Sequence, residues 1–93
     1  MIHSWTNFQK ELKKWCEAET NQVGQTYTYM YIPEKESILV KLTMPDKRTA
    51  KRVITKDVYY KTSNQDITDS VICSAIIQNL KNKFKNKEHI GYT

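Results

Sequence analysis

The residues with the clearest capacity for chemistry are two pairs of adjacent cations, Lys47-Arg48 and Lys51-Arg52. They lie in a segment, residues 38–61, that holds seven Lys and Arg against two Asp. Ammonium groups attract phosphates but read little base sequence. We therefore expect this segment to contact a nucleic-acid backbone, DNA or RNA, with low sequence specificity and a strong dependence on salt.

A second group of lysines lies near the end of the chain, between residues 81 and 87. Together the two groups define the candidate nucleic-acid-binding residues: Lys41, Lys47, Arg48, Lys51, Arg52, Lys56, Lys81, Lys83, Lys85 and Lys87. Each group also has an ordinary explanation, because lysines complement the dipole at a helix C-terminus and charged hairpin tips prevent edge pairing. A net charge of +5 also lies within the range that favours solubility.

Residues that serve catalysis or metal binding are few and poorly spaced. The two histidines, His3 and His89, lie near opposite ends, and no Cys-x-x-Cys or His-x-x-x-His spacing occurs. With Gly24 and Gly91 as the only glycines, no glycine-rich phosphate loop can form. We expect no enzymatic activity, no metal and no cofactor.

The two cysteines, Cys16 and Cys73, fall on apolar faces of predicted helices. We interpret them as buried free thiols in a reducing cytoplasm, with one disulfide between the helices as the alternative. No apolar run is long enough to span a membrane, and the first residues lack the pattern of a secretory signal.

Residues 4–19 have the periodicity of an amphipathic helix. Thr6 with Gln9 fits a capping box at its start, Ser4 is a competing N-cap, and Gly24 can take the left-handed conformation after its end. The apolar stripe consists of Trp5, Phe8, Leu12, Trp15 and Cys16.

Residues 26–32 and 37–44 alternate as two strands joined by a turn at 33–36. A turn centred between Glu34 and Lys35 pairs Tyr27 with Leu42, Tyr29 with Val40 and Tyr31 with Ile38 on one face. The tyrosines could instead stack on bases if they faced outward. We predict that they face the core.

A polar loop at 45–50 leads to a third predicted strand, 51–60, with a bulge or bend near Lys56-Asp57. One of Tyr59 and Tyr60 should then face inward and the other outward. The last element is a helix over 66–87, with Asp66 as its cap and Asp69 in its first turn. Its apolar face comprises Ile72, Cys73, Ile76, Ile77, Leu80 and Phe84.

These elements predict one α+β domain over 1–93, with frayed ends at 1–3 and 88–93. Its α-β-β-β-α order forms a three-stranded antiparallel meander with two helices packed on one face. The order resembles that of double-stranded RNA-binding domains, which carry a histidine in the first strand loop and lysines at the start of the last helix. The corresponding stretches here are Pro33-Glu34-Lys35-Glu36 and Asp66-Ile67-Thr68-Asp69, so we assign the chain to no family.

Two functions from different classes are compatible with this pattern. The first is a small, basic, non-enzymatic nucleic-acid-binding module. The alternative is a cytoplasmic regulator or inhibitor of phage or mobile-element type that binds a protein or nucleoprotein target. An origin of that type fits the many residues with AT-rich codons. The alternative would use exposed apolar residues, and the same surface could form a homodimer: Met30, Leu39, Val71 and Ala75.

Overall fold

The computed structural model describes residues 3–20, 24–63, 67–86 and 91–92. The elements in chain order are α1 (Trp5–Thr20), β1 (Thr26–Ile32), the 3-10 turn η1 (Pro33–Lys35), β2 (Ser37–Thr43), β3 (Arg48–Thr55), α2 (Lys56–Thr62), α3 (Asp69–Asn86) and β4 (Gly91–Tyr92). The α+β class and the antiparallel meander are as predicted, with α2 and the two-residue β4 as additions.

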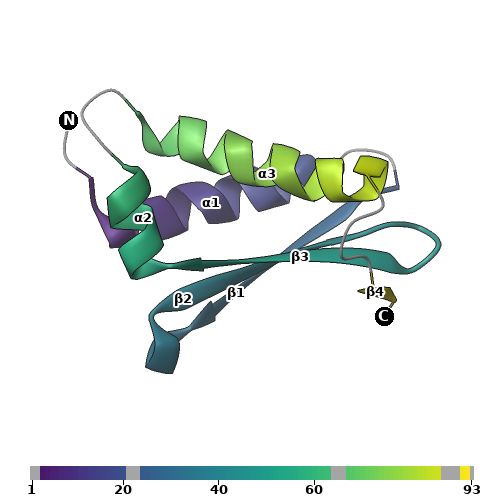
Figure 1. Ribbon diagram of the computed structural model, residues 1–93, viewed down its shortest axis with the longest axis horizontal. Helices are drawn as coiled ribbons and strands as arrows, with labels where there is room; N and C mark the ends of the chain where they lie inside the picture. Colours follow the sequence, from purple (N-terminus) through teal and green to yellow (C-terminus); the bar gives the residue numbers. More distant parts are fainter. Residues whose placement is uncertain (1–2, 21–23, 64–66, 87–90, 93) are drawn as a thin grey trace.

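The molecule has two layers (Figure 1). Helices α1 and α3 lie side by side over one face of the sheet, whose strand order is β1-β2-β3-β4. No described element covers the opposite face, which we call the outer face. Among the described residues, no helix is long and apolar enough to cross a membrane.

The predicted pairing of the first two strands is confirmed. Tyr27 lies opposite Leu42 and Tyr31 opposite Ile38. Burial decreases along β1, from the buried Tyr27 through the partly buried Tyr29 to Tyr31, which is 38% exposed. The tyrosines therefore share the inner face, but only the first is fully part of the core.

The prediction of the third strand is wrong at both ends. It begins at Arg48 instead of residue 51, and it ends at Thr55, where α2 begins instead of a bulge. The Thr55 hydroxyl accepts a hydrogen bond from the Val58 backbone N–H at 3.1 Å and so caps α2. Tyr59 is buried and Tyr60 exposed, as expected, but helical geometry separates them instead of strand alternation.

The two main helices bury the faces that their periodicity predicted, except that Trp15 of α1 is only partly buried. Ser4 is the cap of α1, since its hydroxyl accepts from the Asn7 N–H at 3.4 Å. Asp66, the predicted cap of α3, lies outside the described residues. At the start of the described helix, the Thr68 hydroxyl accepts a hydrogen bond from the Val71 backbone N–H at 3.2 Å. The whole predicted apolar face of α3 is buried: Ile72, Cys73, Ile76, Ile77, Leu80 and Phe84.

Both cysteines are buried free thiols, as predicted. Burial raises the pKa of Cys16 to about 11 and also raises that of Cys73. At pH 8 only about 0.1% of Cys16 is then thiolate, the reactive form.

We expect Ellman's reagent to modify the native protein orders of magnitude more slowly than the protein in denaturant. Two thiols that react at the rate of free cysteine without denaturant would contradict this packing.

Candidate functional site

The fold brings together the two groups of cations that are far apart in the sequence. The Lys83 ammonium donates a hydrogen bond to the Lys51 carbonyl oxygen at 2.6 Å. Nearby, the Arg48 guanidinium lies 5.5 Å from the centre of the Phe84 ring. The last turns of α3 therefore lie beside the first half of β3.

Strand register adds a third lysine to this region. Lys41 on β2 pairs with Lys51 on β3, and alternation points both side chains to the outer face. We define the basic patch as Lys41 and Lys51 on the outer face together with Lys83, which belongs to α3 on the inner side and whose ammonium reaches the Lys51 backbone. None of the three is in an ion pair with a described carboxylate. Like charges directly opposite one another destabilise a sheet, so this arrangement favours an anionic partner.

The two arginines lie on the other side of the sheet. Arg52 pairs with the buried Val40, so its side chain points to the inner face and reaches Asn79 on α3. Arg48 has the same orientation and forms an ion pair with Asp46 at 2.6 Å. The backbone N–H and then the side chain of Arg48 lower the pKa of the Asp46 carboxyl. Neither arginine belongs to the basic patch.

The remaining predicted cations are dispersed. Lys56 lies 3.5 Å from Glu36, and Lys81 lies 3.5 Å from Glu19 on α1. Lys47, in the turn before β3, and Lys85, on α3, are exposed. Lys87 lies outside the described residues. The patch is thus smaller than the predicted set, because ion pairs and the inner face occupy several of its members.

The residues predicted for a protein partner do not form one surface. Met30 and Leu39 pair on the outer face, whereas Val71 and Ala75 are exposed on α3, in the helical layer. Val53, which we did not predict, lies opposite Leu39 and is 57% exposed, as is Met30. Met30, Leu39 and Val53 form an apolar row across three strands, beside the lysines of the patch. Counting the β2–β3 register through the turn before Arg48 would have placed Val53 opposite Leu39, on the outer face.

A cluster of titratable groups lies at the start of α3. The Tyr59 hydroxyl donates to Asp69 at 2.7 Å, and His3 Nδ1 lies 3.5 Å from the same carboxylate oxygen. Burial raises the pKa of Tyr59 most, and the hydrogen bond to Asp69 raises it further. These contacts join the N-terminus, α2 and α3. No group of three His, Cys, Asp or Glu in the described part of the chain could hold a metal ion.

Comparison with known proteins adds nothing to this geometry. No protein-family model, no curated protein and no solved structure matches the chain. The function of the protein must therefore be inferred from its residues and their geometry.

Proposed function

We propose that this protein is a small, non-enzymatic nucleic-acid-binding module that contacts phosphates through the basic patch. The observation that carries the proposal is the convergence of Lys41, Lys51 and Lys83 on one region without a described carboxylate among their ion-pair partners. A polyanionic backbone would relieve the repulsion between opposed lysines and release its own counterions.

The composition of the patch also supports low sequence specificity. Lysine is a point charge, while the bidentate recognition of guanine depends mainly on arginine. Arg48 and Arg52 are both engaged on the inner face. Binding should therefore be governed by the number of phosphates contacted, and its affinity should fall steeply with salt.

The test is fluorescence anisotropy with labelled single-stranded and double-stranded DNA and RNA at low and physiological salt. We expect the triple variant Lys41→Gln, Lys51→Gln, Lys83→Gln to weaken binding at low salt about tenfold or more. The slope of log affinity against log salt concentration should become shallower by about three, because each replacement removes one lysine that neutralises a phosphate.

A matched control removes the same charge elsewhere. Lys10, Lys13 and Lys14 are exposed on α1, and their replacement by Gln also lowers the net charge by three. Binding by this control should stay close to that of the unmodified protein. Equal losses in both triple variants would mean that net charge alone drives association, which would overturn the proposed site.

A second candidate function, binding to a protein, is favoured by the apolar row of Met30, Leu39 and Val53. Met30 and Val53 are exposed and flank the partly buried Leu39, and contiguous apolar side chains on a surface are typical of interaction sites. If none of the four nucleic acids binds at low salt, the nucleic-acid proposal fails and this row becomes the candidate site.

A further inference from the structure

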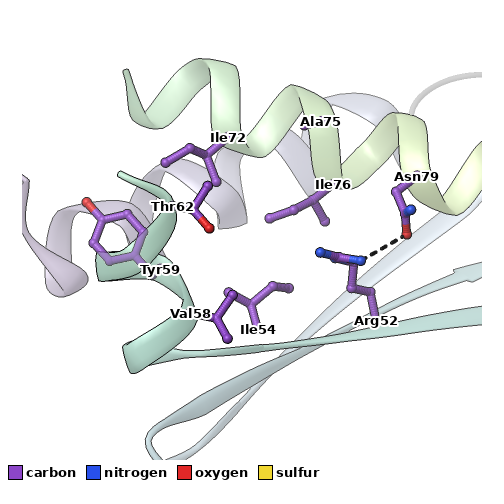
Figure 2. A pocket seen from close by; sticks show the side chains of 9 residues that line it. All are labelled: Arg52, Ile54, Val58, Tyr59, Thr62, Ile72, Ala75, Ile76 and Asn79. Atoms are coloured by element: carbon purple, nitrogen blue, oxygen red, sulfur yellow. Dashed lines mark hydrogen bonds between the residues drawn. The ribbon is translucent and has the colours of Figure 1, made fainter. Parts of the chain in front are cut away.

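A cavity of about 240 Å³ lies between α2, α3 and β3, on the inner side of the sheet (Figure 2). Arg52 and Asn79 lie at one end, and Thr62 on α2 lies at the other. Between these polar ends the walls are apolar: Ile54, Val58, Ile72, Ala75 and Ile76. The cavity is smaller than the roughly 300–1,000 Å³ that accommodates drug-sized ligands, so its occupant must be small.

The Arg52 guanidinium at the polar end of the cavity lacks some of its possible hydrogen-bond partners among the described residues. One terminal nitrogen of Arg52, Nη1, donates to the Asn79 side-chain oxygen at 3.3 Å. Its Nε is buried and has no hydrogen-bond partner among the described residues. No carboxylate in the described part of the chain forms an ion pair with Arg52. The Arg52 guanidinium is therefore a cation without a described counterion in a largely apolar setting.

We propose that this cavity binds a small aliphatic monocarboxylate. The carboxylate pairs with the Arg52 guanidinium, and the aliphatic chain lies along the isoleucines toward α2. Asn79 is a positioning residue, because its hydrogen bond to Nη1 directs the guanidinium into the cavity (Figure 2). A single guanidinium matches the charge of a monocarboxylate and leaves a dianionic phosphate undercompensated.

This site is separate from the basic patch. Arg52 points to the inner face of β3, whereas its neighbour Lys51 points to the outer face. The two proposals can therefore fail independently, since one depends on Arg52 and the other on the patch lysines.

The experiment is a titration of the isotopically labelled protein with sodium octanoate, followed by backbone amide NMR spectra, with 1-octanol as the uncharged probe. We expect octanoate to shift the amides of Ile54 and Ile76 with a submillimolar dissociation constant. We expect 1-octanol to bind about tenfold more weakly, because it offers the guanidinium no charge. Arg52→Gln should remove this preference for octanoate, while Lys51→Gln should keep it.

Three results would overturn the proposal. The first is equal binding of octanoate and 1-octanol to the unmodified protein. The second is unchanged octanoate binding by Arg52→Gln. The third is no amide shift at roughly 10 mM octanoate, which would correspond to a negligible affinity. The comparison of the two probes uses the unmodified protein, so it decides the question even if Arg52→Gln does not fold.

Discussion

Replacement of Tyr59 by alanine should lower the free energy of unfolding by about 3–5 kcal/mol, the usual loss when a buried aromatic side chain is truncated. Tyr59 is fully buried, and its ring stacks on Phe8 with centroids 4.4 Å apart. The centroid of the Trp5 ring lies 5.8 Å from that of the Tyr59 ring. One side chain on α2 thus fills the space between three helices, and its removal leaves a cavity. Urea unfolding followed by tryptophan fluorescence measures the loss.

Two further variants separate the ring from its hydroxyl. Tyr59→Phe keeps the stacking but removes the hydrogen bond to Asp69, so we expect a smaller loss of about 1–2 kcal/mol. Tyr31→Ala makes the same truncation at a side chain that is 38% exposed, and its cost should be well below that of Tyr59→Ala. Equal losses for Tyr59→Ala and Tyr31→Ala would contradict the central position of Tyr59.

Val40→Asp should prevent folding, whereas Val53→Asp should leave the fold intact. Val40 is fully buried on the inner face, and an unpaired carboxylate there costs several kcal/mol, comparable with the roughly 5–15 kcal/mol that stabilises a typical domain. Val53 is 57% exposed on the outer face, and surface substitutions usually change stability by less than about 0.5 kcal/mol. Circular dichroism and thermal unfolding of both variants provide the test.

The pair is matched because both substitutions exchange the same residues and add the same charge. Unfolding of Val53→Asp would show that the outer face is part of a core, which would exclude it as a binding surface. A folded Val40→Asp would contradict the assignment of the inner face. Either result would also remove the structural basis of the basic patch, since Lys51 shares its face with Val53.

The parts of the fold that depend on local periodicity could be predicted from the sequence. The apolar stripes of α1 and α3 have helical spacing, and all the residues predicted for the face of α3 are buried. The pairing of Tyr31 with Ile38 follows from a short turn between two alternating strands, so the register could be counted along the chain. The same local reasoning placed the cysteines on buried faces.

The ends of β3 could not be predicted in this way. The run Val58-Tyr59-Tyr60 has the composition of a strand, but the Thr55 cap and the burial of Tyr59 beneath α1 favour a helix. Tertiary packing thus outweighed local propensity. The predicted strand runs to residue 60 with a bulge, so its alternation does not decide which side chains face outward.

The grouping of the cations depends on tertiary packing and could not be predicted from the sequence. Lys83 and Lys51 are 32 residues apart in the sequence, and their contact exists because α3 crosses the sheet beside β3. Lys51 and Arg52 are adjacent in the sequence but point to opposite faces, because successive side chains of a strand alternate. Composition records how many charges a chain carries, while the packing of helix on sheet determines which of them a ligand can reach together.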